Sequence, residues 1–246
     1  MISFLYCGIL FLYPAVLTYF KEVSMQMSSR FVPKDPGSAV THMIGFVGAV
    51  FLTVPLLTEA VRQGRDAAAV LALGIFMLSM ELLYAASTLY HTIDGTPKVN
   101  RFLKRFDHMM IYMLIAGTYT PICVIALPDT VGVNLLQLVW GIAAVGLTVS
   151  AIWVNCPRWF SAAVYICMGW VCLTALPQII AALSSGGFLW LLAGGIFYTV
   201  GGIIYALKLR LLNERFPNFG SHEIFHLFVL AGSLCHFVVM YEFLPI

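Results

Sequence analysis

The last part of the chain reads SHEIFHLFVLAGSLCHFVVMYEF from Ser221 to Phe243, and it combines a long apolar run with regularly spaced histidines. The run reaches the roughly 20 residues that a helix needs to cross a bilayer. Its start, His222, Glu223 and His226, spells HExxH, a pattern typical of zinc metalloprotease helices. Two questions follow: which solvent surrounds this helix, and which kind of metal site the histidines form.

The composition of the whole chain indicates an integral membrane protein. Hydrophobic residues make up 61% of the 246 residues, charged residues only 10%, and the mean hydropathy is +0.94. Soluble domains are nearer half apolar and a quarter charged, so this chain carries too few charges to cover a surface that faces water. The net charge of +2 gives no indication of a nucleic-acid partner.

Seven apolar runs are long enough to span a bilayer, and the polar connections between them are too short for a soluble domain. Prolines inside some runs do not argue against spans, because membrane helices tolerate them. We therefore predict an all-α, polytopic bundle of seven transmembrane helices over residues 35–246. The predicted spans are residues 40–61, 67–91, 107–128, 132–154, 159–182, 187–208 and 221–243.

An eighth apolar run, residues 3–20, precedes this bundle. It lacks the basic start and the small-residue cleavage site of a secretory signal. An extra span, an interfacial helix, and translation from an upstream start followed by Met25 or Met27 are the open interpretations. We expect residues 1–34 to form a separate N-terminal segment that is dispensable for the chemistry.

Lys and Arg residues fall mainly on one side of the predicted bundle, which predicts its orientation. Arg62 and Arg65 mark the other side. The bundle therefore begins in the cytoplasm, and Ile246 lies outside. The basic residues of the cytoplasmic side are Arg30, Lys34, Lys98, Arg101, Lys104, Arg105, Arg158, Lys208, Arg210 and Arg215.

This topology brings histidines that are distant in sequence to one depth of the membrane. The second span ends at the cytoplasmic side with His91, the third begins there with Asp107, and the seventh begins there with His222 and His226. Ionisable residues inside spans are costly and by default indicate function. His222 and His226 share one helix face, about 6 Å apart along the axis. We predict that His91, His222 and His226 bind one metal ion.

Zinc is the predicted ion, because three imidazoles and a water form an open zinc site of the catalytic type. Iron, nickel and copper are the alternatives. None of the six cysteines forms a CxxC pair, so neither a disulfide framework nor a thiolate site is indicated. Ser87, four residues before His91, and Asp107 are the groups predicted to handle the water or orient an imidazole.

Three other polar residues of the spans are interpreted as structural. His236 lies about 15 Å along the helix from His226, too far for the same ion, and we expect it to make a polar contact towards the outer side. Glu81 is expected to pair with a neighbouring helix. For His42 we favour capping or packing, with a supporting role at the metal site as the alternative.

A protease is disfavoured despite the HExxH spelling. Sites of that kind usually take their third ligand from downstream, and here the twenty residues after His226 continue one apolar helix. The third ligand must therefore come from another span, with His91 as the best candidate. The position of Glu223 does not exclude a role as general base, and Asp107 with Ser87 forms the competing pair.

Three motifs together resemble those of the bacterial hemolysin III family, which is the prokaryotic arm of the progestin and adipoQ receptors and is related to the adiponectin receptors. They are STLYH (Ser87–His91), RFDHMMIYMLIAGTYTP (Arg105–Pro121) and SHEIFHLFVLAGSLCHF (Ser221–Phe237). The resemblance covers about residues 35–246. It implies a seven-helix bundle with a cytoplasmic N-terminus, a location in the bacterial inner membrane, and a zinc ion near the cytoplasmic face.

The resemblance also implies roles for individual residues. The SxxxH motif falls on Ser87 and His91, the aspartate of the third helix on Asp107, and the HxxxH pair on His222 and His226. The three histidines would be zinc ligands, and Ser87 and Asp107 would hold the water. The glutamate between the paired histidines is not part of this motif, so we interpret the HExxH spelling as incidental.

Two classes of function follow. The first is a zinc-dependent hydrolase of a lipid amide or ester, similar to the ceramidase-like activity attributed to the wider superfamily, with Asp107 and Ser87 as catalytic residues. The second is a receptor, a membrane-homeostasis protein or a pore-forming hemolysin with a structural zinc, although no span carries the polar stripe of a channel. A membrane lipid is the expected substrate or ligand. The pairs Gly194–Gly195 and Gly201–Gly202 predict close helix packing, within one chain or between two copies.

Overall fold

The computed structural model describes residues 33–153, 156–207 and 220–244, so residues 1–32 of the predicted N-terminal segment lie outside the described residues. Residues Lys34–Ile246 form one compact unit. Its elements are α2 (Pro36–Arg62), α3 (Ala67–Thr92), α4 (Pro97–Pro121) with η1 (Ile122–Ala126), α5 (Asp129–Ile152), α6 (Arg158–Gly169), η2 (Trp170–Ala175), α7 (Leu176–Ala182), α8 (Ser185–Leu207), α10 (Ser221–Val238) and η3 (Val239–Phe243).

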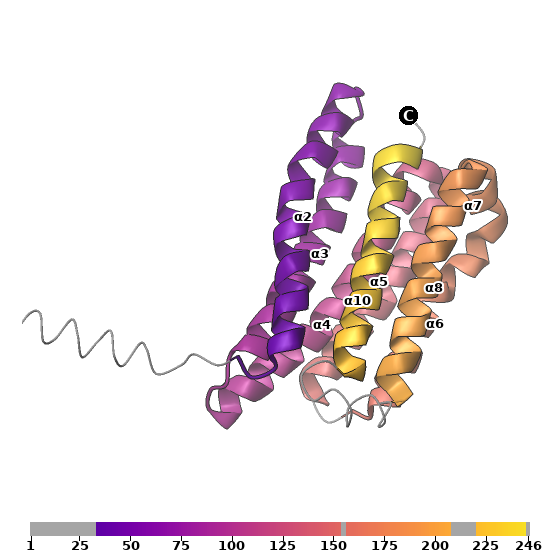
Figure 1. Cartoon of the computed structure of the whole chain (residues 1–246). Helices are drawn as coiled ribbons and strands as arrows, with labels where there is room; N and C mark the ends of the chain where they lie inside the picture. The colour runs from indigo at the N-terminus through magenta and orange to yellow at the C-terminus, as the bar shows by residue number, and fades with distance from the viewer. Residues whose placement is uncertain (1–32, 154–155, 208–219, 245–246) are drawn as a thin grey trace, which may run out of the picture. The chain divides into compact units, whose positions relative to one another are not determined.

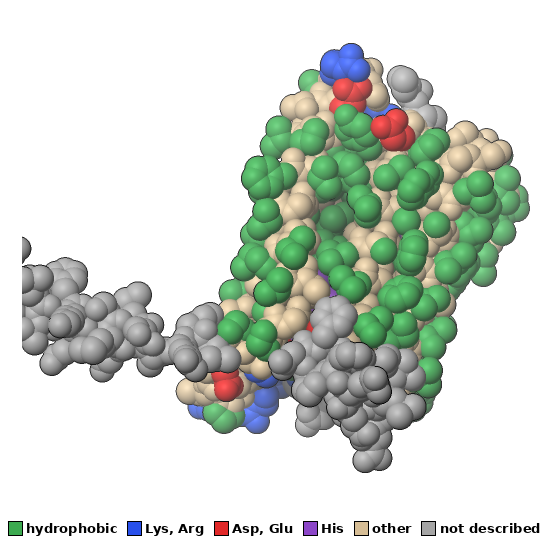
Figure 2. Space-filling view, viewed as in Figure 1, with side chains coloured by type: hydrophobic (Ala, Val, Ile, Leu, Met, Phe, Trp, Pro, Cys, Tyr) green, Lys and Arg blue, Asp and Glu red, His purple; other side chains and the backbone are tan. Residues whose placement is uncertain are grey.

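The predicted fold class is confirmed. Within the described residues, seven helical stretches are long and apolar enough to cross a membrane. Hydrophobic side chains cover the middle of the face shown in Figure 2, and charged side chains gather at its two ends. This distribution is the one expected of a bundle whose sides face lipid.

The third span begins earlier than predicted, at Pro97 instead of residue 107. The Thr96 side chain accepts a hydrogen bond from the Val99 N–H, and Pro97 occupies the first turn, where its missing N–H costs nothing. The basic residues from Lys98 to Arg105 therefore lie on the first turns of α4 and not in a connection. Hydropathy measured the apolar part of this helix, whereas capping decides where the helix starts.

A break in the fifth span is bridged by a side chain of the third. Pro177 has no N–H, and its ring excludes regular α-helix just before it, so the chain winds as a 3-10 helix through η2. The Tyr119 hydroxyl of α4 donates to the Gly169 carbonyl at 2.6 Å and accepts from the Cys172 N–H at 2.9 Å. The backbone groups freed by the break are thereby paired inside the protein, as a membrane requires.

The order of packing brings four helix ends together. Helix α10 packs between α2 and α8, while α3 contacts both α2 and α4 (Figure 1). The end of α3 and the beginnings of α2, α4 and α10 all lie at the lower end of the bundle in Figure 1, which carries His91, His222 and His226. We call it the histidine end.

The contact between α3 and α4 depends on a glycine. A Cβ atom added at Gly117 would clash with the Ser79 side chain and come within 3.3 Å of the Ile75 carbonyl oxygen. The two helices therefore approach closely at this level. This packing holds α4, with Asp107, against the helix that carries Ser87 and His91.

Replacing this glycine should loosen the helix pair. We expect Gly117→Ala to lower the free energy of unfolding by about 1–3 kcal/mol, because overpacking forces neighbouring atoms to shift. Thermal unfolding in detergent measures the change. Gly74→Ala on α3 is the matched control, because a Cβ there meets nothing within 4 Å. Equal stability of the two variants would contradict the packing argument.

Candidate metal site

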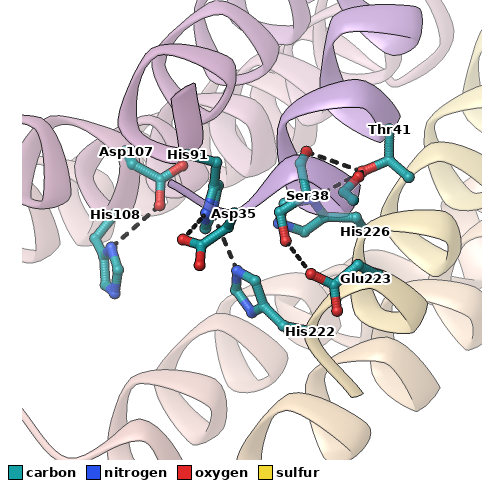
Figure 3. Close-up of polar contacts among 10 residues, drawn as sticks. Asp35, Ser38, Thr41, His91, Asp107, His108, His222, Glu223 and His226 are labelled. Atoms are coloured by element: carbon teal, nitrogen blue, oxygen red, sulfur yellow. Dashed lines mark hydrogen bonds and ion pairs between the residues drawn. The ribbon is translucent and has the colours of Figure 1, made fainter. Parts of the chain in front are cut away.

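Three histidines from two helices converge at the histidine end. His91 lies in the last turn of α3, and His222 and His226 lie in the first turns of α10. One potential ligand atom from each ring lies within 4.8 Å of the others, and Figure 3 shows the three side chains facing a common region. The structure thus brings together the residues that the topology predicted to meet, and they could hold a metal ion.

The spacing of two ring nitrogens suits a shared ion. His91 Nε2 lies 3.1 Å from His222 Nε2. Nitrogens bound at about 2.0–2.1 Å to a tetrahedral zinc lie roughly 3.3 Å apart. A hydrogen bond between the two rings has a similar length, but it gives no reason for the third imidazole beside them. The donor set fits zinc.

The start of α2 orients His91. Asp35 Oδ2 accepts a hydrogen bond from His91 Nδ1 at 2.9 Å, and the Asp35 N–H donates to the His91 carbonyl at 2.9 Å. The carboxylate holds the proton on Nδ1, which leaves the Nε2 lone pair free for a ligand bond. An imidazole ligand commonly has such a partner on its second nitrogen.

His226 is held in the same way by another residue of α2. The Thr41 hydroxyl donates to the carbonyls of Gly37 and Ser38, so its proton is already engaged. Its oxygen lies 3.2 Å from His226 Nδ1 and therefore accepts from that nitrogen. The His42 ring stacks on the His226 ring with centroids 3.6 Å apart and planes 4° apart. Thr41 therefore holds the edge of the His226 ring, and His42 packs on its face.

Sequence reasoning missed Asp35 and Thr41. The Asp-Pro pair that opens the first span was a signal, because it places a carboxyl group at the depth of the histidines. His42 was expected to pack or to support the site, and the structure places it in packing contact with a candidate ligand. Both of its ring nitrogens are buried without a hydrogen-bond partner among the described residues.

The Glu223 side chain makes its hydrogen bonds at the start of α10 and not with the three histidines. Its Oε1 accepts from the Ser38 hydroxyl at 2.6 Å, and its Oε2 accepts from the Gly220 N–H at 2.7 Å. The side chain caps α10 and ties it to α2, and it does not belong to the candidate ligand group. This arrangement agrees with the interpretation that the HExxH spelling is incidental.

Ser87 and Asp107 lie beside the histidines, lining the same cavity as His222 and His226. Both are buried. Ser87 Oγ has no hydrogen-bond partner within the described part of the chain, whereas Asp107 Oδ2 lies 3.3 Å from His108 Nδ1. Because buried hydroxyls are nearly always paired, the unpaired one indicates a group that the chain itself does not supply. Their assigned roles stay predictions.

Two further predictions have different outcomes. Glu81 accepts from the Thr53 hydroxyl of α2 at 2.6 Å, which confirms pairing with a neighbouring helix. His236 is outside the candidate ligand group, as its distance along α10 indicated. The expected polar contact is absent at its Nδ1, which has no hydrogen-bond partner among the described residues; the ring packs on Tyr198 instead.

A cavity of about 270 Å³ extends from the histidine end into the bundle. Residues of α4, α6, α8 and α10 line it. Because the lining includes residues from both ends of α8 and of α10, the cavity runs along these two helices. Most of the lining is apolar, as in Leu83, Ile115, Ile166, Leu173, Leu192 and Val229. The polar groups of the histidine end therefore open onto a space suited to a hydrocarbon chain.

Comparison with known proteins gives consistent matches. A model of the family described as haemolysin-III related matches residues 31–237. The chain is 38% identical to Hemolysin-3 of Bacillus cereus over 222 residues, which are 90% of this chain and 97% of that protein. It is 38% identical to the Hemolysin-3 homolog of Bacillus subtilis (strain 168) over 206 residues, 84% and 92% of the two chains. The adiponectin receptor protein of Drosophila melanogaster is 22% identical over 230 residues, 84% of this chain and 50% of that receptor.

Metal affinity should depend on both the ligands and their partners. We expect His226→Ala to remove bound zinc, and Asp35→Asn to weaken zinc binding about 10- to 100-fold, the usual effect of losing a partner of a ligand. Titration against a competing chelator measures the affinity. Asp94→Asn is the control, because this exposed carboxylate bonds Asn100 at the same end of the bundle. Unchanged affinity in Asp35→Asn would contradict the orientation argument.

The Glu223 side chain tests the two meanings of HExxH. We expect Glu223→Gln to leave zinc content unchanged and to lower stability by less than about 1.5 kcal/mol, since an amide oxygen still accepts one of the two hydrogen bonds. Metal analysis and thermal unfolding check both statements. Loss of zinc in this variant would show that the glutamate belongs to the metal site.

Proposed function

Because the chain belongs to the haemolysin-III-related family, we propose that it is an integral membrane, zinc-dependent hydrolase of a lipid amide or ester. The membership confirms the resemblance inferred from the three sequence motifs. One observation carries the proposal: a buried carboxyl group and an unpaired buried hydroxyl lie beside three imidazoles, at one end of an apolar cavity.

The residues of the site suit a hydrolytic reaction. His91, His222 and His226 would hold the ion, with Asp35 and Thr41 fixing two of the rings. Zinc held by imidazoles lowers the pKa of a bound water to about 7 and polarises a carbonyl group. Asp107 would accept the proton of the attacking water and return it to the leaving group.

Ser87 would orient the attacking water or the carbonyl oxygen of the substrate. The residue lines the cavity, and its buried hydroxyl has no hydrogen-bond partner among the described residues. A hydroxyl without a competing partner can donate to the reacting oxygen without first breaking another hydrogen bond.

The cavity supports a lipid as the substrate. Its volume of about 270 Å³ is close to the lower end of small-ligand pockets, about 300–1,000 Å³. Because most of the lining is apolar, an acyl chain in the cavity would leave few polar groups of the protein without a hydrogen-bond partner. The carbonyl would then lie at the histidine end, where the reacting groups are, and the chain would exclude water from them.

The basic residues support an orientation of this site. Lys98, Lys104 and Arg158 lie at the histidine end, whereas Arg62 and Arg65 lie at the opposite end of the bundle. Cytoplasmic ends carry the excess of Lys and Arg. We therefore infer that the histidine end faces the cytoplasm, that the membrane is the bacterial inner membrane, and that the carboxyl terminus lies outside.

A structural metal is the second candidate. The three histidines join α3 to α10, and Asp35 and Thr41 join both helices to α2. A zinc ion there would hold three helices together without any turnover, which suits a receptor or membrane-homeostasis protein. The apolar lining of the cavity disfavours a pore for water or ions.

Asp107 separates the two candidates. In a hydrolase, Asp107→Asn should keep its zinc and lose about 10²- to 10⁴-fold in turnover, the usual contribution of a general base. Metal content and cleavage of a fluorescent ceramide and a fluorescent fatty acyl ester are measured on the same samples. Asp129→Asn, at an exposed helix start, is the matched control. Zinc without turnover in every sample, including the wild type, would favour the structural role.

A further inference from the structure

A second polar cluster borders the cavity deeper in the bundle, where its members on α10 lie about two to three turns beyond His226. It consists of Tyr84, Tyr198, Ser233 and His236, and we call it the mid-cavity cluster. Tyr198 and His236 are among the residues that line the cavity. Tyr84, Ser233 and His236 are buried, with 1%, 2% and 6% of their surfaces exposed. The mechanism proposed above uses none of the four.

The hydroxyl groups of this cluster have one proton more than they have partners. Tyr84 Oη donates to Ser233 Oγ at 2.6 Å, and Ser233 Oγ bonds Tyr198 Oη at 2.8 Å. If Ser233 donates in the second bond, the proton of Tyr198 is left over. If Tyr198 donates, the proton of Ser233 is left over. Either way, three hydroxyls share two hydrogen bonds, and one donor is unused.

The imidazole of the cluster also has a nitrogen that makes no hydrogen bond to the described residues. His236 Nδ1 has no hydrogen-bond partner in the described residues, and its ring lies 5.3 Å from the Tyr198 ring between centroids. A buried polar group without a partner destabilises the fold, because it has lost its hydrogen bonds to water and gained none. Two such groups side by side indicate a binding site and not two separate defects.

Two glycines make room for the polar rings. A Cβ added at Gly194 would lie 2.7 Å from His236 Nε2, and one added at Gly232 would lie 2.6 Å from the Tyr198 ring. The rings occupy space that any larger residue would fill. The arrangement is therefore built into the packing of α8 against α10.

The distance between the two polar sites defines a length. His226 and His236 lie on the same α-helix, ten residues apart, which is about 15 Å along the axis. A saturated chain of roughly ten to twelve carbons, with C–C bonds of about 1.5 Å, covers that distance. A hydrocarbon chain with its carbonyl at the histidine end would pass the mid-cavity cluster at that depth.

We propose that the mid-cavity cluster is a second binding subsite, which accepts a hydroxyl or oxo group carried by the acyl chain about ten to twelve carbons from its carbonyl. The inference rests on the proposed function and names its substrate class, lipids oxygenated in the middle of the chain. The unused hydroxyl proton would donate to the oxygen of the ligand. The free nitrogen of His236 would pair with a hydroxyl of the ligand.

Competition among positional isomers tests this subsite without requiring turnover. Zinc-loaded, full-length protein in detergent is equilibrated with an equimolar mixture of 5-, 9- and 12-hydroxystearate, and the bound isomers are separated and quantified by chromatography and mass spectrometry. The isomers enter micelles almost equally, so the bound ratio reports recognition by position. We expect the 12-isomer to be enriched about three- to tenfold over the 5-isomer, the effect of one or two net hydrogen bonds.

Three variants assign that preference. His236→Leu should abolish the enrichment. Tyr198→Phe should at least halve it, because this variant removes the hydroxyl of the cluster that lines the cavity and leaves only the Ser233 proton unused. Tyr198→Phe also keeps the ring in place should His236→Leu fail to fold. Tyr205→Phe is the matched control, because Tyr205 lines the same cavity from the same helix, seven residues nearer the histidine end, and it should keep the preference.

Each outcome has a distinct meaning. Binding of all three isomers in equal amounts would overturn the inference and leave the proposed function intact. A preference that persists in Tyr198→Phe and His236→Leu would overturn it too, by placing the recognition elsewhere. No binding of any fatty acid to the wild type would overturn both the subsite and the lipid-filled cavity.

Discussion

Polar groups inside a bilayer cannot rely on water, and the arrangement of this bundle depends on that constraint. The backbone meets it by forming helices, and where η2 departs from α-helix, the Tyr119 hydroxyl pairs with the freed groups. The Glu81 side chain satisfies the same constraint by accepting a hydrogen bond from Thr53 of the neighbouring helix. Several buried polar atoms of the described residues are exceptions, and those of His42, Ser87 and His236 belong to residues that line the cavity.

The beginning of α2 organises the candidate metal site although it supplies none of the three candidate ligands. Asp35 orients His91, Thr41 orients His226, and Ser38 holds Glu223 at the start of α10. Because these residues fall within about two turns of chain, one helix start fixes the ends of two other helices. A metal bound there would stabilise contacts that already exist. The same feature explains how a structural and a catalytic role can share one set of residues.

The HExxH spelling shows why a motif needs its surroundings. In this chain the two histidines face a third from another helix, whereas Glu223 turns to Ser38 and to the Gly220 N–H. The general-base position that the spelling implies is thus occupied by a helix cap. The carboxyl group available to the cavity is instead Asp107, more than a hundred residues earlier in the chain.

Hydropathy alone determined the fold class, since apolar runs of bilayer length leave few other arrangements. The alternating directions of the spans then predicted that His91, Asp107, His222 and His226 lie at one depth. In the structure the three histidines lie together, and Asp107 lines the cavity that His222 and His226 also line. The start of the third span was predicted ten residues too late, because the cap at Thr96 and not apolarity sets it. Only the tertiary structure could pair Asp35 with His91 or Thr41 with His226, since those partners are 56 and 185 residues apart and no local pattern connects them. The cavity and the unpaired Ser87 and His236 were likewise decided by packing, because a vacant space or a missing partner is a property of neighbours in space and leaves no trace in the order of residues.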